Sequence, residues 1–274
     1  MSLDPDAWEE TMAKAPFVAH SPIPESMMKL FQKTLLAVAT FAIAAMPILA
    51  AQPRLVFGSD CTFPPMEMVD ANKQIVGFDI DMIQAVAKAA GFEAVVKNTA
   101  WDGIFAGLAA GDFDAVLSSV TITAERSRTL AFSSPYLDAG QVLIVNKDLS
   151  GLTVLNQFGG KKVGAQIGTT GALEVAKFRT IKLKSYDEAG LAVEDLYVGR
   201  IDAVVLDSPT ARNYVLRNGR YKSKLKIVGN PFTDEHYGIA MKKGDQKTLE
   251  MINRGLDIIK KDGTLAKLVH KWLD

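Results

Sequence analysis

The stretch from Ser118 to Arg126 combines a row of hydroxyl residues with an arginine at the start of a predicted helix. Strand alternation places the side chains of Ser119, Thr121 and Thr123 on one face. Thr123 suits a helix N-cap, because its hydroxyl can accept a free backbone N–H. Arg126 then falls in the first helical turn, where a cation opposes the helix dipole. This placement indicates a carboxylate site, since a guanidinium binds both carboxylate oxygens at once. An ordinary surface arginine is the alternative for this segment alone.

A glycine-rich segment from Gly164 to Gly171 lies between a predicted strand over 162–166 and a predicted helix over 172–178. Free backbone N–H groups at a helix N-terminus favour an anion, and glycines allow a ligand to approach the backbone. The glycine spacing differs from a dinucleotide-binding fingerprint, and residues 159–162 do not complete a P-loop. The segment therefore indicates either an anion site or a plain strand-to-helix turn.

Acidic and aromatic residues follow other predicted strands, at the edge where open α/β sheets bind ligands. Asp207 ends a predicted strand over 203–206 and could hold an ammonium group or cap the next helix. Asp60, Phe63 and Trp101 each come just after a predicted strand. Two aromatic rings and a carboxylate suit an elongated cationic side chain. Ordinary core packing is the alternative for each aromatic residue taken singly.

The composition excludes several function classes. With 31 basic and 31 acidic residues among 274, the chain has no net charge to favour a nucleic acid. One cysteine, Cys61, excludes an intrachain disulfide and also a structural Cys/His zinc cluster, since such clusters use at least two cysteines. No serine lies in a G-x-S-x-G elbow, and Asp79 and Asp81 are typical of a solvated helix start. We expect no cofactor, metal or catalytic residue, and an inert rather than reactive Cys61 thiol.

The N-terminal region has the pattern of a secretory signal. Lys29 and Lys33 precede an uncharged run over 34–51 that ends in the small residues Ala50 and Ala51. No cysteine is present there to carry a lipoprotein anchor. An uncleaved membrane anchor is the alternative, but the alanines and a proline weaken it.

We therefore predict a signal peptide over residues 27–51 and an unstructured upstream extension over 1–26. Cleavage at the end of the signal would begin the mature chain near Gln52 and place it in an oxidising, extracytoplasmic compartment. Whether residues 1–26 are translated in the cell is open, because Met27 and Met28 would be natural starts for such a signal.

The mature chain alternates short apolar runs with amphipathic helical ones, which is typical of an α/β protein. Expected strands lie over 54–58, 93–97, 115–118, 162–166, 203–206 and 237–241, and expected helices over 78–90, 104–110, 172–178, 191–198, 247–261 and 264–273. The segment 111–116 resembles 199–204, each a glycine turn that enters a buried strand. This repeat predicts two similar lobes, with a ligand cleft between them.

Five short motifs together resemble the bacterial solute-binding protein family 3, the periplasmic polar amino-acid-binding proteins of ABC importers. The motifs are residues 58–67, 77–81, 121–126, 168–171 and 199–203, and the resemblance covers Arg54 to Asp274. The tail, with 261–264 and Trp272, also looks like the last helices of the family.

The resemblance implies a type II periplasmic-binding-protein fold, in which two α/β lobes close on a ligand through two crossing hinge segments. Lobe 1 would comprise residues 54–135 plus 236–274, and lobe 2 residues 141–230. The hinges would fall at 136–140 and 231–235.

The resemblance also implies roles for the site residues. Arg126 would grip the α-carboxylate of an amino acid, helped by the backbone N–H groups of Thr121 and Thr170. Asp207 would take the α-ammonium, with oxygens from Ser119 and Thr121. Phe63 and Trp101 would flank the ligand side chain, and Asp60, Ser118 and Gln166 would line its distal end. Thr169, next to Thr170, is the last implied ligand-binding residue.

The segments 98–105 and 166–171 look most like the arginine-, lysine- and histidine-binding branch, so we expect a basic amino acid as ligand, a membrane permease as partner, a monomer, and a periplasmic location. Glutamine is the alternative ligand, since glutamine binders also carry an acid at the position of Asp60. Cys61 departs from the small or hydroxyl residue usual in relatives and could narrow the pocket.

Cyclohexadienyl dehydratases resemble the same scaffold but carry a catalytic glutamate just after the lobe-2 loop. Here Ala172 stands at that position and Glu174 is displaced, which argues against an enzyme. A sensor that presents its ligand to a chemoreceptor or kinase also stays open.

Overall fold

A computed structural model describes residues 24–28 and 52–274. Residues 25–28 form a single helical turn in which the N–H groups of Met27 and Met28 donate to the carbonyl of Pro24. The predicted extension over 1–26 and signal peptide over 27–51 otherwise lie outside the described residues. Among the helices that the structure describes, none is long and apolar enough to cross a membrane.

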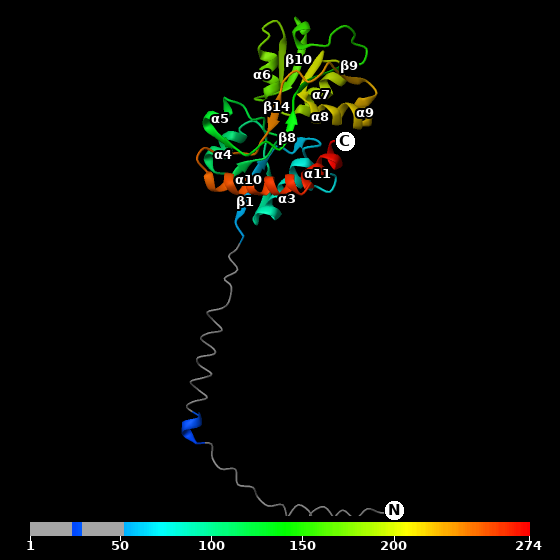
Figure 1. The fold of residues 1–274 in the computed structure, drawn as a ribbon. Helices are drawn as coiled ribbons and strands as arrows, with labels where there is room; N and C mark the ends of the chain where they lie inside the picture. Colours follow the sequence, from blue (N-terminus) through cyan, green and yellow to red (C-terminus); the bar gives the residue numbers. More distant parts are fainter. Residues whose placement is uncertain (1–23, 29–51) are drawn as a thin grey trace, which may run out of the picture. The chain divides into compact units, whose positions relative to one another are not determined.

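Residues 52–274 form one compact unit built on two five-stranded sheets (Figure 1). The first sheet has the order β5-β1-β6-β15-β7. Its strands are β1 (Arg54–Ser59), β5 (Glu93–Asn98), β6 (Ala115–Val116), β7 (Leu130–Phe132) and β15 (Ala240–Lys242). Strand β1 runs parallel to both neighbours, with Arg54 opposite Glu93, whereas β15 runs antiparallel.

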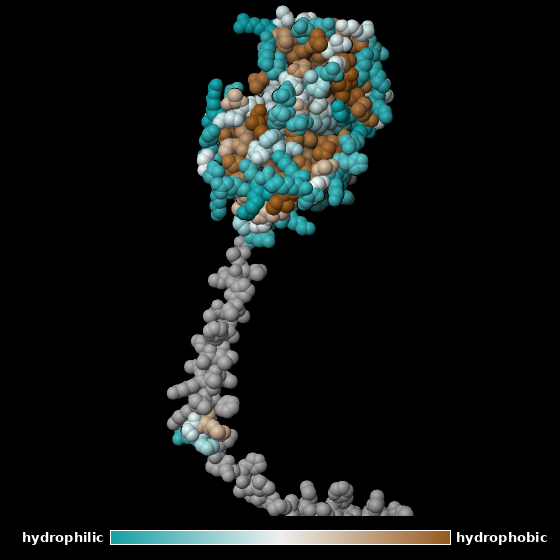
Figure 2. Space-filling view, viewed as in Figure 1, coloured by the Kyte–Doolittle hydropathy of each residue, from teal (hydrophilic) through white to brown (hydrophobic). Residues whose placement is uncertain are grey.

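The first sheet carries the helices α3 (Phe78–Ala90), α4 (Ile104–Ala110), α5 (Arg126–Thr129), α10 (Gln246–Lys261) and α11 (Thr264–Trp272), and a small sheet of β2 (Thr62–Phe63), β3 (Glu67–Val69) and β4 (Ile75–Val76). Helix α10 packs against α3, and Ile252, Leu256 and Ile259 form its buried stripe. Its outer face is mostly hydrophilic (Figure 2), although Ile258 is exposed there. Gly255 allows the close approach, because a Cβ there would lie 2.6 Å from the carbonyl oxygen of Val86.

The second sheet has the order β11-β10-β12-β9-β13 and repeats the plan of the first. Its strands are β9 (Gln141–Asn146), β10 (Lys162–Gln166), β11 (Lys182–Tyr186), β12 (Ala203–Asp207) and β13 (Leu225–Val228). Its helices are α6 (Thr170–Ala176), α7 (Ala189–Tyr197), α8 (Ser208–Arg212) and α9 (Gly219–Lys222), with a 3₁₀ turn η2 (Leu155–Phe158) and a π-turn η3 (Asn213–Arg217). Strand β10 is parallel to β11 and β12, and β9 is antiparallel to β12.

The chain passes twice between the sheets, through β8 (Leu137–Ala139) and β14 (Glu235–Tyr237). These two strands pair antiparallel, with Glu235 opposite Ala139, and Figure 1 shows them between the two sheets. The arrangement is the expected α/β fold of two lobes joined by two crossing segments. Below, lobe 1 means the part built on the first sheet and lobe 2 the part built on the second.

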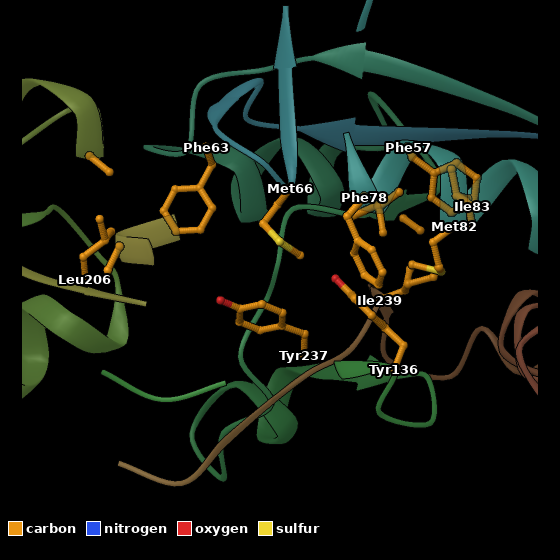
Figure 3. Close-up of a cluster of buried hydrophobic side chains, with 14 of the residues drawn as sticks. Phe57, Phe63, Met66, Phe78, Met82, Ile83, Tyr136, Leu206, Tyr237 and Ile239 are labelled. Carbon is orange, nitrogen blue, oxygen red and sulfur yellow. The ribbon is translucent and has the colours of Figure 1, made fainter. Parts of the chain in front are cut away.

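The main hydrophobic core contains side chains from both lobes. Figure 3 shows Phe63 and Leu206 on one side of this cluster and Tyr237 beside Tyr136, whose ring centroids lie 6.2 Å apart. Tyr237 is fully buried. Full burial of one large apolar side chain contributes about 1.5–3 kcal/mol to folding. Apolar packing therefore stabilises the junction between the lobes as well as each lobe.

One expected strand is divided in the structure, and several strands were not expected from the sequence. The strand predicted over 237–241 is divided into β14, which ends at Tyr237, and β15, which begins at Ala240. At Gly238 the chain changes partners, and a Cβ there would lie 2.8 Å from the side chain of Ile122. Strands β9, β11 and β13 were missed altogether, as was β7 at the edge of the first sheet.

Candidate functional site

A cavity lies between the two lobes. It is lined by Asp60, Phe63, Trp101, Ser118, Ser119, Thr121, Arg126, Gln166, Thr169, Thr170 and Asp207. These are the eleven residues predicted from the sequence, and the fold brings all of them to one place. The parallel strands β1, β10 and β12 explain this, because residues at their carboxyl ends meet at the sheet edges that face the cavity.

Arg126 is held in place from both lobes. Its backbone N–H donates to the hydroxyl of Thr123 at 3.1 Å, in the turn that leads into the short helix α5. The N-cap of α5 is Glu125 rather than the predicted Thr123. Its guanidinium Nη1 donates to the carbonyl of Thr121 at 2.9 Å, and Nη2 donates to the carbonyl of Gly168, in lobe 2, at 3.2 Å. Backbone carbonyls from both lobes therefore orient the fork.

Two aromatic rings cover the Arg126 guanidinium. The centroids of Trp101 and Phe105 lie 5.4 and 5.3 Å from its central carbon, within the range of a cation–π contact. Burial lowers the pKa of Arg126, and the negative charges of Asp207 and Glu235 oppose that shift. Arg126 stays a cation at neutral pH because its ordinary pKa is so high.

Asp207 ends the buried strand β12 and faces the cavity from lobe 2. Its Oδ1 accepts from Gln141 Nε2 at 2.8 Å, and its Oδ2 accepts from the Tyr237 hydroxyl at 2.6 Å. Burial, and next the charge of Glu235, raise the pKa of Asp207 to about 6. Its side chain makes no capping bond to helix α8, so the alternative role of a helix cap does not hold.

Asp60 connects the lobes at another part of the cavity. Its Oδ2 accepts from Gln166 Nε2, in lobe 2, at 2.8 Å, and its Oδ1 accepts from the Thr62 hydroxyl at 2.7 Å. The same Gln166 nitrogen also donates to the carbonyl of Asp187 at 2.8 Å. Asp60 therefore offers a buried carboxylate whose position depends on contact between the lobes.

Sequence reasoning missed Glu235 and Gln141. Glu235 Oε2 accepts from the hydroxyls of Thr121 at 2.8 Å and Thr170 at 2.9 Å, and from Gln141 Nε2 at 3.3 Å. Its Oε1 accepts from the Thr233 hydroxyl at 2.9 Å. The sequence signal was weak, because Glu235 sits at the end of a predicted hinge and Gln141 just after the other.

The reading of Asp79 as part of a solvated helix start was wrong. Asp79 is fully buried, as is Glu67, and burial is the largest cause of a raised pKa for both. Asp79 Oδ2 accepts from the Ser119 N–H at 2.8 Å and the Tyr136 hydroxyl at 2.9 Å. Asp81 is the more exposed member and pairs with Lys271 at 2.7 Å.

Cys61 is buried beside the site, and its thiol donates to the carbonyl of Ser59 across 3.6 Å. Burial raises the pKa of the Cys61 thiol to about 11. Because the thiolate is the reactive form, a raised pKa favours the inert thiol that we expected over a reactive one.

Two α/β lobes, two crossing segments and a charged cavity between the lobes define a two-lobed solute-binding protein. The chain belongs to the family of bacterial extracellular solute-binding proteins, family 3, which matches residues 55–274. The description of this family as extracellular is in line with the extracytoplasmic location expected from the N-terminal sequence.

Two curated relatives cover most of the chain. A probable histidine-binding protein of Neisseria gonorrhoeae is 36% identical over 230 residues, which is 81% of this chain and 85% of that protein. The ABC transporter arginine-binding protein 1 of Escherichia coli K12 is 34% identical over 252 residues, or 90% of this chain and 99% of that protein.

Solved structures resemble the fold over the same region. An ancestral arginine-binding protein bound to arginine is 41% identical, with a TM-score of 0.77, and the match covers 81% of this chain and 99% of that one. The structure of an ancestral arginine-binding protein bound to glutamine matches with 41% identity and a TM-score of 0.76, over 81% of this chain and 98% of that one.

Proposed function

We propose that this protein is the periplasmic substrate-binding component of an ABC amino-acid importer and binds an L-amino acid with a cationic side chain. One observation carries the proposal: Arg126, Asp207 and Asp60 line the same cavity. Their charges match the carboxylate, the ammonium and the side-chain cation of such a ligand. Two relatives support this substrate class, since one is named a probable histidine-binding protein and the other an arginine-binding protein.

In the proposed complex, the α-carboxylate binds the Arg126 fork and the backbone N–H groups of Thr121 and Thr170. The α-ammonium binds Asp207, with Ser119 and Thr121 as further acceptors. A charge-assisted hydrogen bond contributes about 1.5–3 kcal/mol, so Arg126 and Asp207 would supply much of the affinity.

The ligand side chain would lie between Phe63 and Trp101 and reach Asp60, Ser118 and Gln166. Three carboxylates, those of Asp60, Asp207 and Glu235, face one guanidinium in and around the cavity. A zwitterionic head group leaves this excess of negative charge unchanged, whereas a side-chain cation reduces it. The charge balance therefore favours a basic ligand over a neutral or acidic one.

We further propose that the lobes, 54–135 plus 236–274 and 141–230, open and close about hinges at 136–140 and 231–235. The bonds from Gln166 to Asp60 and from Arg126 to Gly168 cross between the lobes, so opening would break both. The mature protein, cut from its signal near Ala50 or Ala51, would then act as a monomer that delivers its ligand to a membrane permease.

Glutamine is the second candidate ligand, because structures of an ancestral arginine-binding protein were solved with arginine and with glutamine. A side-chain amide could donate to Asp60 as a guanidinium would. A dehydratase activity is not supported. Glu174 lies in a surface groove, where its carboxylate is 2.5 Å from the Lys177 ammonium, and Ala172 offers no acid in its place.

Isothermal titration of the mature protein with L-arginine, L-lysine, L-histidine and L-glutamine tests the proposal. Binding of a basic amino acid that Asp60→Asn weakens and Arg126→Ala abolishes would support it. Selective glutamine binding would keep the receptor role and overturn the assignment of a basic ligand. Failure to bind any of the four would contradict the amino-acid assignment and reopen a role on other solutes or as a sensor for a chemoreceptor or kinase.

A further inference from the structure

Four hydroxyl groups on the cavity wall donate their hydrogen bonds to carboxylates that lie behind the wall. The bonds run from Ser118 to Glu67 (2.9 Å), from Ser119 to Asp79 (3.3 Å), and from Thr121 and Thr170 to Glu235 (2.8 and 2.9 Å). All four hydroxyl residues line the cavity, and none of the three acids does. The acids are buried, with Glu67 and Asp79 at 0% and Glu235 at 6% exposure.

This geometry decides which way the hydroxyl hydrogens point. A hydroxyl has one hydrogen and two lone pairs, and an ionised carboxylate can only accept. Each hydroxyl that faces a carboxylate must therefore turn its hydrogen away from the cavity. Lone pairs are then all that it can present to a ligand.

Glu67 and Asp79 still accept the hydrogen bonds of Ser118 and Ser119, although the two acids interact with each other. Glu67 Oε2 and Asp79 Oδ1 have no other hydrogen-bond donor among the described residues, and one proton shared between them satisfies both. Burial, and next the charge of Asp79, raise the pKa of Glu67, so the proton belongs on that side. The oxygens that face Ser118 and Ser119 remain acceptors.

Asp79 also stabilises an uncommon backbone conformation at the wall. Ser119 has a φ of 48°, in the left-handed region that non-glycine residues seldom adopt. Its N–H and its hydroxyl both donate to Asp79 Oδ2. The carboxylate therefore sets both the backbone and the side chain of this residue.

Glu235 has the most direct connection to the proposed ammonium site. One of its oxygens holds Thr121 from lobe 1 and Thr170 from lobe 2, and Gln141 bridges it to Asp207. Thr121 Oγ1 receives no hydrogen bond from any described residue, so both of its lone pairs are free for a ligand.

We propose that Glu67, Asp79 and Glu235 are positioning residues that make the cavity hydroxyls acceptors and so select a ligand that carries an α-ammonium group. An ammonium has three hydrogens to donate, and Asp207, Thr121 and Ser119 would receive them. A ligand without that group would leave the acceptors unpaired and would be rejected. This inference rests on the proposed function and adds the reason why the wall recognises an ammonium.

The test compares L-arginine with 5-guanidinopentanoate, which lacks only the α-ammonium, by isothermal titration at pH 7.5. The variants are Glu235→Gln, which loses the charge but keeps an oxygen acceptor, and Glu235→Leu, which loses both. We expect the wild type to prefer arginine at least 100-fold and Glu235→Gln to keep most of that preference. In Glu235→Leu the Thr121 and Thr170 hydrogens are released, and the preference should fall at least tenfold.

Equal loss of preference in the Gln and Leu variants would overturn the inference, because charge alone would then explain the selectivity. No loss in either would overturn it as well. Asp234→Asn is the control, since it removes a charge from an exposed side chain one position away and should change nothing. If the wild type binds glutamine instead, glutamine and its deamino analogue replace the ligand pair. If it binds none of the four amino acids, the proposed function itself fails.

If circular dichroism shows that Glu235→Leu does not fold, Thr121→Val and Thr121→Ser test the same inference. Valine preserves the branched shape without an acceptor, whereas serine keeps the hydroxyl. We expect Thr121→Val to weaken arginine binding about tenfold without weakening the analogue, and Thr121→Ser, which keeps the acceptor oxygen, to weaken it less than Thr121→Val does. Equal weakening of both ligands by Thr121→Val would indicate a purely structural role and contradict the inference.

Discussion

Two pairs of buried carboxylates lie close to the cavity, and they differ in what balances them. Glu67 and Asp79 lie in lobe 1, and for each of them burial is the largest cause of a raised pKa. Asp207 and Glu235 lie where the lobes meet, and the charge of Arg126 acts to lower the pKa of Asp207. The first pair is balanced by a proton and the second by a nearby guanidinium.

This difference in charge balance indicates that the two carboxylate pairs have different roles. A pair that holds its own proton has no need of a ligand and can serve as a constant support for the cavity wall. A pair balanced only in part by one arginine leaves negative charge for an ammonium to neutralise. The predictions that follow test this contrast, from the largest expected effect to the smallest.

Replacing Arg126 by alanine should have the largest effect. It removes the carboxylate fork and the only guanidinium that lines the described cavity. The loss of two charge-assisted bonds corresponds to about 3 kcal/mol or more, so the Kd for arginine should rise at least about 100-fold. Isothermal titration measures this, with Arg128→Ala, at an exposed position, as the control. A change of less than tenfold would contradict the proposed role of Arg126.

Asp207→Asn should weaken arginine binding by about 10- to 100-fold, because the ammonium loses its charged partner at about 1.5–3 kcal/mol. Glu67→Gln should change the Kd less than threefold, since glutamine reproduces a protonated glutamate that donates to Asp79. Side-by-side titration of the two variants separates the ligand-directed pair from the supporting pair. Similar losses in both would remove the contrast.

Ligand affinity should depend on pH through Asp207. Its pKa of about 6 in the unliganded protein means that the carboxylate is protonated below that value and cannot pair with an ammonium. Affinity for arginine should therefore fall as the pH decreases from 7 to 5, by up to about tenfold per pH unit below the pKa. Titration across this range measures the slope, and Asp207→Asn should flatten it. An unchanged slope in that variant would assign the pH dependence to another group.

Stability should depend on pH through Asp79, with the opposite sign from an ordinary salt-bridged acid. Its pKa is raised from 3.8 to about 6, so the folded state holds the proton more tightly than the unfolded state. The resulting stabilisation is full below pH 3.8 and is lost as the pH rises through about 6. Compared with the wild type, Asp79→Asn should lose less unfolding free energy between pH 4.5 and 7. Parallel curves from denaturant unfolding would rule this out.

The smallest expected effect concerns the supporting pair alone. Glu67→Gln should change the free energy of unfolding by less than about 1 kcal/mol at pH 7. Glu67→Leu leaves the Ser118 hydroxyl and an Asp79 oxygen without partners, and each unpaired buried group costs about 1–3 kcal/mol. Chemical denaturation of both variants checks the difference. A large loss in the glutamine variant would show that Glu67 is ionised in the folded protein.

Site residues that directly follow a strand or begin a helix could be predicted from the local sequence. Arg126 at the start of α5 and Asp207 at the end of β12 were recognisable, because the starts of helices and the ends of strands depend on neighbouring residues. Strands β9, β11 and β13 were missed. At Gly238, where the strand divides, the backbone lies against Ile122, more than 100 positions earlier in the chain, and no local pattern predicts this proximity.

The sequence by itself determined the family, the α/β architecture and the eleven residues that line the cavity. Only the tertiary structure decided that the hydroxyl groups of the cavity wall donate to buried carboxylates and present acceptors to the cavity. Ser118 meets Glu67 across 51 positions and Thr121 meets Glu235 across 114. The pKa of a carboxylate and the direction of a hydroxyl depend on burial and on the nearest partner, and both arise only when distant segments pack together.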